Sequence, residues 1–136
     1  MTKLKTALVD HRRIFNMEIN LNDVTLYYRI EGFGDPALVM HGGLGADHTT
    51  FLNSGFNKLS NQLELTYYDH RCNGRSSFPE IETLTHENLA ADAENLRIAL
   101  DHKNLTVIGH SYGGITGLEY ALRYPENLRR LILITT

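Results

Sequence analysis

The sequence has little cysteine and no long apolar run, and each shortage excludes a class of protein. Cys72 is the only cysteine in 136 residues, so no disulfide can form within the chain, as is typical of a reducing compartment. No stretch approaches the roughly 18 apolar residues of a membrane-spanning helix. Residues 1–10 lack the apolar core and the cleavage site of a secretory signal. We therefore expect a cytoplasmic protein without a membrane anchor.

The chain also lacks a large excess of charge of either sign. Its 13 Lys and Arg residues and 16 Asp and Glu residues leave a formal net charge of −3. Because the basic residues are dispersed, we expect neither nucleic acid nor an anionic membrane as a partner. The histidines and the cysteine show no metal-ligand spacing, so we predict no metal and no other cofactor. The length suits one domain.

Hydrophobic patterning predicts an antiparallel hairpin followed by alternating strands and helices. The hairpin is expected from strands at 14–20 and 24–31, joined by the turn residues 21–23. Further strands are expected at 37–40, 65–69, 105–109 and 131–135, and helices at 49–62, 85–100 and 115–124. This alternation is typical of an α/β fold, a mostly parallel sheet flanked by helices. Functional residues are then expected at the carboxyl ends of the strands.

The strongest candidate for a catalytic site is the segment Gly109-His110-Ser111-Tyr112-Gly113. It lies between an apolar strand pattern and a helical pattern, and its G-x-S-x-G spacing is that of a nucleophile elbow. In such an elbow one strained serine sits between strand and helix, and glycines allow the two backbones to approach closely. We predict that Ser111 is a nucleophile.

A second glycine-rich segment, His41-Gly42-Gly43-Leu44-Gly45, follows the predicted strand 37–40. An acyl-transfer enzyme needs backbone N–H groups directed at the oxyanion of its tetrahedral intermediate. We predict that the N–H groups of Gly43 and Tyr112 are these donors. Gly42, Leu44 and His110 are candidates for substrate contact, and His41 is expected to hold the loop rather than act as a base.

The segment 67–76, YYDHRCNGRS, ends the predicted strand 65–69. Its polar residues suit a buried loop near the site, with Asp69 expected to pair with Arg71 or Arg75 because buried charges need partners. We expect a structural role for this segment. Cys72 is interpreted as an inert small residue, and His70 is disfavoured as a base.

The three motifs together, in this order, resemble those of α/β-hydrolases of the proline iminopeptidase-like group. The resemblance covers residues 14–136, which correspond to the N-terminal half of that family's domain. It implies Ser111 as nucleophile and the N–H groups of Gly43 and Tyr112 as oxyanion donors. Two positions depart from the family pattern: Leu44 stands where HGGPG has proline, and Cys72 stands where D-x-R-G-x-G-x-S has its first glycine. Both departures weaken the aminopeptidase assignment but not the fold.

The sequence after Ser111 contains no histidine. In the resembled family the triad runs Ser, then Asp or Glu, then His, and a helical cap inserted after the last strand shapes the substrate pocket. We therefore expect the sheet to be incomplete after its sixth strand, with residues 131–135 at an apolar edge. Such an edge is a pairing site, so we expect a second polypeptide carrying the C-terminal half, or self-association.

Three functions follow from these observations. The first is a serine hydrolase component acting on an ester, amide or peptide substrate, including release of an N-terminal residue, once a C-terminal half is supplied. The isolated chain should then be inactive or very weak, because a serine hydroxyl needs an adjacent base. The second is a non-catalytic fragment or assembly subunit that retains the fold. The third is a lyase on the same serine scaffold; an aspartate-nucleophile enzyme is disfavoured by the serine in the elbow.

Overall fold

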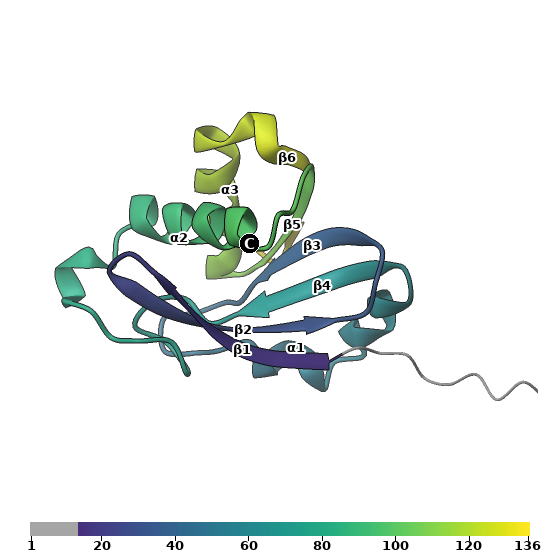
Figure 1. Ribbon diagram of the computed structural model, residues 1–136, viewed down its shortest axis with the longest axis horizontal. Helices are drawn as coiled ribbons and strands as arrows, with labels where there is room; N and C mark the ends of the chain where they lie inside the picture. The colour runs from purple at the N-terminus through teal and green to yellow at the C-terminus, as the bar shows by residue number, and fades with distance from the viewer. Residues whose placement is uncertain (1–13) are drawn as a thin grey trace, which may run out of the picture.

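The hairpin and the alternating elements form one six-stranded mixed sheet in the computed structural model of the chain, which describes residues 14–136 (Figure 1). The expectation about a secretory signal concerns residues 1–10, which lie outside this range. The strands are β1 (Ile14–Leu21), β2 (Val24–Glu31), β3 (Asp35–Met40), β4 (Leu63–Tyr68), β5 (Leu105–His110) and β6 (Leu128–Ile134). The α-helices are α1 (Thr49–Leu52), α2 (His86–Ala99) and α3 (Tyr112–Arg123), and short 3-10 helices span Phe56–Asn61, Ile81–Thr83 and Pro125–Asn127.

The strand order, β1-β2-β4-β3-β5-β6, places the site at a topological switch. β1 and β2 pair antiparallel, as does β2 with β4, whereas β4, β3, β5 and β6 run parallel. After β3 the chain turns to β4 on one side, and α2 then carries it back across the sheet to β5 on the other side. Ligands bind where such connections diverge, beyond the carboxyl ends of the strands. Here that point lies between β3 and β5.

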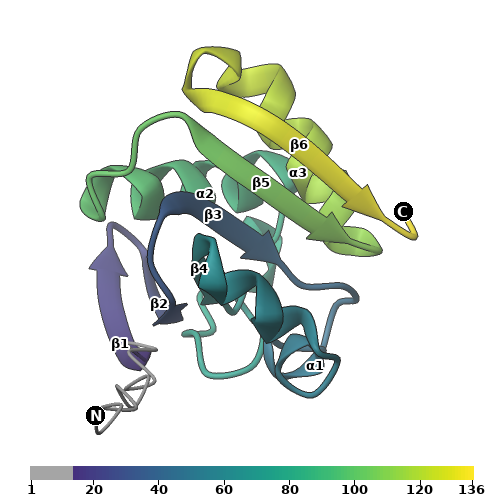
Figure 2. The same cartoon turned by 90° about the vertical axis from the view of Figure 1, so that its right-hand side faces the viewer.

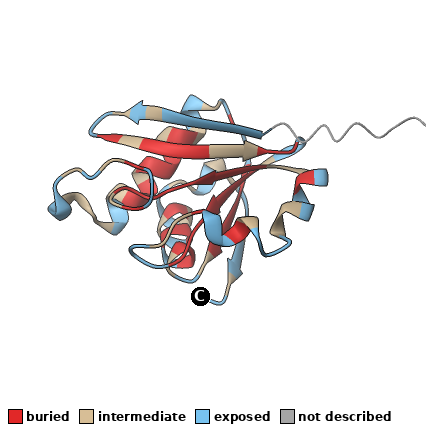
Figure 3. Ribbon diagram, turned by 90° about the horizontal axis from the view of Figure 1, so that it is seen from below, coloured by how far each residue is buried: buried red, intermediate tan, exposed pale blue. Residues whose placement is uncertain are grey.

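Helices cover both faces of the sheet, α2 and α3 on one face and α1 on the other (Figures 1 and 2). The larger core cluster lies on the α2 and α3 face and includes Leu38, Met40, Leu96, Val107 and Tyr120. The smaller cluster lies on the α1 face and includes Val39, Phe51, Tyr67 and Ile108. Neighbouring residues of a strand thus contribute to opposite cores, and Figure 3 shows the central strands buried along their length. Burial on both faces explains why 37–40 is continuously apolar.

The helix expected at 85–100 is confirmed, with Thr85 as its N-cap: the Thr85 hydroxyl accepts a hydrogen bond from the Asn88 N–H at 3.2 Å. The single helix expected at 49–62 is wrong. α1 ends after Leu52, and a separate 3-10 helix begins at Phe56. Gly55 between them has a φ of 77°, and the Ser54 hydroxyl donates to the carbonyl of Phe51 at 2.8 Å. A serine hydroxyl that competes for backbone acceptors, followed by a left-handed glycine, ends the helix.

β6 forms one edge of the sheet, as expected for residues 131–135 (Figure 2). Ile132 is 42% exposed and Leu133 is 44% exposed. The α3 helix beside it also leaves an apolar stripe open to solvent, formed by Ile115, Leu118 and Leu122. Within residues 14–136, no helix is both long enough and apolar enough to cross a bilayer.

Candidate active site

Ser111 occupies the turn between β5 and α3 in a backbone conformation that few residues adopt. Its φ is 53° and its ψ is −120°, and its side chain is exposed. The Ser111 N–H donates to the carbonyl of Ile134 at 3.0 Å, and its carbonyl accepts from the N–H of Gly114 at 2.9 Å. These bonds hold a strained residue in place, as an elbow that presents a nucleophile requires.

Close packing requires a glycine at residue 113, two residues after Ser111. A β-carbon on Gly113 would lie 2.6 Å from the carbonyl oxygen of His41 and 2.6 Å from the carbonyl carbon of Met40. Both are backbone atoms and cannot turn aside. Gly113 therefore allows α3 to begin directly against the carboxyl end of β3.

The predicted oxyanion loop lies against this elbow. A β-carbon on Gly42 would meet Ser111 Cβ at 3.0 Å and His110 Nδ1 at 3.0 Å. Gly43 has a φ of 60°, in the left-handed region that favours glycine. The structure thus brings Gly42, which precedes Gly43, against His110 and Ser111, although the two segments are far apart in sequence.

The remaining predicted site residues lie around this group. Leu44 is 55% exposed at the tip of the loop. Tyr112 follows Ser111 at the start of α3, where burial raises the pKa of its phenol. The His110 ring lies edge-on to Phe51, with 5.9 Å between the ring centroids. The oxyanion and substrate roles of these residues stay predictions.

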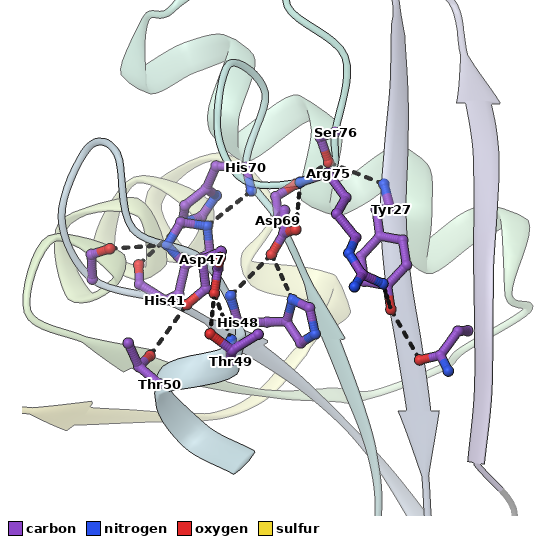
Figure 4. A network of polar contacts seen from close by, with 12 residues as sticks. Tyr27, His41, Asp47, His48, Thr49, Thr50, Asp69, His70, Arg75 and Ser76 are labelled. Carbon is purple, nitrogen blue, oxygen red and sulfur yellow. Dashed lines mark hydrogen bonds and ion pairs between the residues drawn. The ribbon is translucent and has the colours of Figure 1, made fainter. Parts of the chain in front are cut away.

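Hydrogen bonds between three pairs of residues pin the chain after β3 to the segment after β4, and Figure 4 shows the two pairs that involve His41 and His48. The His70 N–H donates to Nε2 of His41 at 3.0 Å. The Gly45 N–H donates to Oδ1 of Asn73 at 2.5 Å. Asp69 Oδ1 accepts from the backbone N–H and from Nδ1 of His48, at 2.9 and 2.7 Å. The structural role expected for the segment 67–76 is therefore to hold the candidate oxyanion loop.

Asp69 pairs with His48, not with Arg71. Its second carboxylate oxygen accepts from the backbone N–H of Arg75 at 2.9 Å, while the Arg75 guanidinium lies over the Tyr27 ring at 5.0 Å. Burial raises the pKa of the Asp69 carboxyl, but the hydrogen bonds from His48 and from the Arg75 N–H outweigh it and hold that pKa below its ordinary value. The expected pairing with Arg71 is wrong, and that with Arg75 involves only its backbone.

Arg71 instead turns toward α2. Its Nε and Nη2 donate to the two carboxylate oxygens of Asp92, each at 2.7 Å, and both side chains are buried. Its Nη1 and Nη2 also reach the Asp23 carboxylate at the hairpin turn, both at 3.2 Å. One guanidinium therefore joins the hairpin, the segment after β4 and α2.

Sequence reasoning missed two residues of this network, His48 and Asn73. It assigned no partner to His48, although the side chain is 3% exposed and hydrogen-bonded to Asp69. The available signal was position: both residues lie in segments that follow the carboxyl end of a buried strand, His48 eight residues after β3 and Asn73 five residues after β4, where polar side chains from different loops meet.

Asp47, His48 and Asp69 bring three possible ligand atoms within 4.8 Å of one another. Their hydrogen bonds explain this cluster. Asp69 Oδ1 accepts from His48, and Asp47 Oδ1 accepts from the N–H of Thr49 at 2.8 Å. The absence of a metal stays a prediction.

Four of the six histidines in residues 14–136 have hydrogen-bond partners other than Ser111, so none of these four is placed to act as its base. His41 contacts the Gly42 carbonyl, His48 contacts Asp69, His70 contacts His41, and His102 contacts Glu64. None of these four contacts involves Ser111. A serine hydroxyl without such a base is a weak nucleophile.

Two cavities flank the elbow. One of about 360 Å³ lies between the start of α2 and α3, lined by Leu84, Thr85, His86, Glu87, Tyr112 and Glu119. The other, of about 190 Å³, is mostly apolar and lies on the α1 face, lined by Thr50, Phe51, Ser54, Phe56, His110 and Ile134. Both lie beside the predicted nucleophile rather than over it.

Cys72 should be strained in its present conformation. Its φ is 60°, and its thiol makes only a 3.7 Å contact with the Pro79 carbonyl. Replacing it with glycine removes a cost of roughly 1–2 kcal/mol for an L-residue in the left-handed region, offset by the roughly 0.5–1 kcal/mol that glycine loses in chain entropy. We therefore expect Cys72→Gly to raise the free energy of unfolding by about 0.5 kcal/mol, measured by urea denaturation. A decrease would show that the thiol contact outweighs the strain.

Known proteins share both the fold and the sequence pattern. A proline iminopeptidase of Lactiplantibacillus plantarum is 33% identical over 123 residues, covering 85% of this chain and 42% of that protein. A cis-3-alkyl-4-alkyloxetan-2-one decarboxylase of Shewanella oneidensis is 31% identical over 121 residues, covering 87% of this chain and 37% of that protein. The chain thus spans less than half the length of these relatives.

The crystal structure of a proline iminopeptidase-related protein from Thermus thermophilus superposes with a TM-score of 0.82 at 26% identity. The superposition covers 89% of this chain and 44% of that one. These similarities confirm the resemblance inferred from the motifs and the expected α/β fold. Residues 36–136 match the family described as alpha/beta hydrolase fold, and the chain belongs to that family.

Proposed function

We propose that this chain is the nucleophile-bearing part of a serine hydrolase that acts by acyl transfer. The observation that carries the proposal is Ser111, exposed in a strained turn at the switch point of the sheet and packed against Gly42. Relatives named as hydrolytic enzymes support the same reaction class.

In the proposed reaction, Ser111 Oγ attacks the carbonyl carbon of an ester or amide, and its proton passes to a base. The carbonyl π electrons move to oxygen, and the N–H groups of Gly43 and Tyr112 stabilise that oxyanion. Collapse of the intermediate breaks the bond to the alcohol or amine, which leaves with the proton. Water then attacks the acyl-serine, and the same steps release the acid and restore Ser111.

The base and its acidic partner are proposed to come from a further polypeptide segment that completes the sheet. The open edge of β6 supports this, because Ile132 and Leu133 are exposed beside unpaired backbone groups. The exposed stripe on α3, formed by Ile115, Leu118 and Leu122, would be covered by the same segment. Self-association through β6 is the alternative way to cover this edge.

For the substrate, we propose a small ester, amide or peptide, including one from which an N-terminal residue is released. Support comes from the relatives named proline iminopeptidase, and the single cysteine supports a cytoplasmic location. A relative named as a decarboxylase makes a lyase-type reaction the second candidate, and product analysis separates it from hydrolysis.

Labelling by an activated phosphonate tests the proposal. In the assembly that includes the completing segment, the label should attach to Ser111, and Ser111→Ala should abolish it. Ser60→Ala, which changes a serine in the 3-10 helix Phe56–Asn61 outside both cavities, is the control and should label like the parent. Without the completing segment we expect labelling at least about a thousandfold slower, because removing a triad member costs several orders of magnitude.

Two results would overturn the assignment. Persistent labelling of Ser111→Ala would place the nucleophile elsewhere. No labelling in any assembly would favour the alternative reading of a non-catalytic subunit that retains the fold.

A further inference from the structure

Two histidine rings lie buried against each other beneath the loop of residues 41–45. His41 begins this loop and His70 belongs to the segment after β4; both are 0% exposed, and their ring centroids are 4.2 Å apart. The His70 N–H donates to His41 Nε2 at 3.0 Å, and His70 Nε2 lies 3.2 Å from the His41 carbonyl oxygen. His41 Nδ1 lies 2.9 Å from the carbonyl oxygen of Gly42 (Figure 4).

These contacts assign the proton positions of both neutral rings. His41 Nε2 accepts a hydrogen bond and so carries no proton, which places the His41 proton on Nδ1, donating to Gly42. His70 Nε2 faces a carbonyl, so it carries the His70 proton. His70 Nδ1 is then an acceptor, buried without a partner among residues 14–136.

Each ring loses part of this arrangement when it gains a second proton. A proton on His41 Nε2 would face the His70 N–H, which sets two donors against each other. A proton on His70 Nδ1 would place a positive charge where no described residue accepts a hydrogen bond from it. Unpaired buried charge is costly, so the pair must separate before it is fully protonated.

We propose that His70 is a positioning residue for the loop of residues 41–45, and that protonation of the His41–His70 pair releases this loop. The predicted oxyanion donor Gly43 lies two residues after His41, so release would misplace it. The consequence for catalysis rests on the proposed function above, whereas the consequence for loop structure does not.

The charges around the pair determine the direction of this response. Burial is the largest influence and lowers the pKa of His41. The carboxylates of Asp69 and Asp47 act in the opposite direction and raise this pKa, whereas His48 lowers it further. Burial and the neighbouring His41 lower the pKa of His70 to about 3, although the carboxylate of Asp69 raises it. The ring of Tyr68 packs edge-on to the His70 ring, with 5.1 Å between the ring centroids.

Because both pKa values are depressed in the folded state, the contribution of the pair to stability is fully present above the ordinary histidine pKa of about 6.5. It declines as the pH falls from there toward about 3, the folded pKa of His70. The loop should therefore open on acidification.

Two variants of His70 and one control test the proposal. His70→Phe keeps a ring but removes the donor to the His41 carbonyl. His70→Gln keeps an N–H donor in reach of the Nε2 position and cannot be protonated. His102→Gln changes another histidine with low exposure, bonded to Glu64 at the opposite end of the parallel strands, and should leave the loop unaffected.

The primary readout is NMR of the histidine ring nitrogens and of Gly45 amide exchange, from about pH 7 to about pH 4. We expect His41 to be protonated on Nδ1 at neutral pH. His70→Phe should speed Gly45 exchange about tenfold, the loss of one hydrogen bond. In His70→Gln the Gly45 amide should exchange as in the parent. Loop opening on acidification should then take up about one proton per molecule, rather than the roughly two expected of the parent.

Three results would overturn the proposal: a His41 proton on Nε2, parental Gly45 exchange in His70→Phe, or an unchanged proton uptake in His70→Gln. Phosphonate labelling of Ser111 in the same variants distinguishes a failure of the loop proposal from a failure of the proposed hydrolase function. If the parent does not label, the hydrolase proposal fails while the NMR result still decides the role of His70. If the parent labels, His70→Phe should label more slowly and His70→Gln like the parent.

Discussion

Asp92→Ala should lower the free energy of unfolding by about 3–5 kcal/mol, the usual loss when one partner of a buried ion pair is removed. The Asp92 side chain is 4% exposed and that of Arg71 is 3% exposed, and two 2.7 Å hydrogen bonds join them. Without Asp92, the guanidinium stays buried. Its remaining charged partner, Asp23, has a side chain that is 56% exposed. Urea denaturation followed by circular dichroism measures the loss.

The matched control for Asp92→Ala is Glu119→Ala, which removes an acidic partner of Arg123 on the surface of α3. Glu119 and Arg123 are four residues apart, and Nε of Arg123 donates a hydrogen bond to the Glu119 carboxylate at 2.6 Å on the solvent-exposed surface. Because exposed pairs of this kind contribute little, the unfolding midpoint of Glu119→Ala should equal that of the parent within error. Equal stability of the two variants would show that the Arg71–Asp92 pair does not hold the hairpin and α2 together.

Gly113→Ala should lower the free energy of unfolding by roughly 3 kcal/mol, at the upper end of the usual cost of overpacking. The new methyl group would stand 2.6 Å from the His41 carbonyl oxygen, which belongs to the backbone of the candidate oxyanion loop. Either α3 or this loop must move, so Ser111 labelling should fall together with stability. Denaturation and phosphonate labelling of the same preparation measure both effects.

Gly117→Ala is the control within the same helix. Its methyl group would meet side-chain atoms only, Leu131 Cδ1 at 3.0 Å and Val107 Cγ1 at 3.4 Å. These can shift, and alanine is favoured over glycine in a helix interior by about 1 kcal/mol. We expect a change within about 1 kcal/mol of either sign. A loss as large as that of Gly113→Ala would mean that α3 tolerates no added volume anywhere, and that the elbow has no special constraint.

Local pattern was sufficient for most of the fold. The hairpin, the helix capped by Thr85 and the strand before Ser111 follow from periodicity, turn residues and capping, which act between near neighbours. The single helix expected at 49–62 is the exception, although the residues that interrupt it, Ser54 and Gly55, also act locally. Those two residues end α1 through a left-handed backbone and a competing hydroxyl.

The partners of the buried polar residues could not be predicted in the same way. Asp69, Arg71 and His48 are close in sequence to other charged groups, and local reasoning paired Asp69 with Arg71 or Arg75. The structure instead pairs Arg71 with Asp92, 21 residues away, and Asp69 with His48, also 21 residues away. Which groups meet depends on the strand order, since β4 and β3 are neighbours and α2 crosses above them.

The sequence by itself determined the α/β fold class, the strained serine at residue 111 and the glycine loop that begins at residue 42. These features depend on backbone conformation and periodicity, which neighbouring residues specify. Only the tertiary structure decided that the loop packs on the elbow, that the segment after β4 pins it, and that His41 and His70 share buried hydrogen bonds. Those contacts join residues from separate strands, and their geometry exists only when the sheet order brings the carboxyl ends of β4, β3 and β5 side by side.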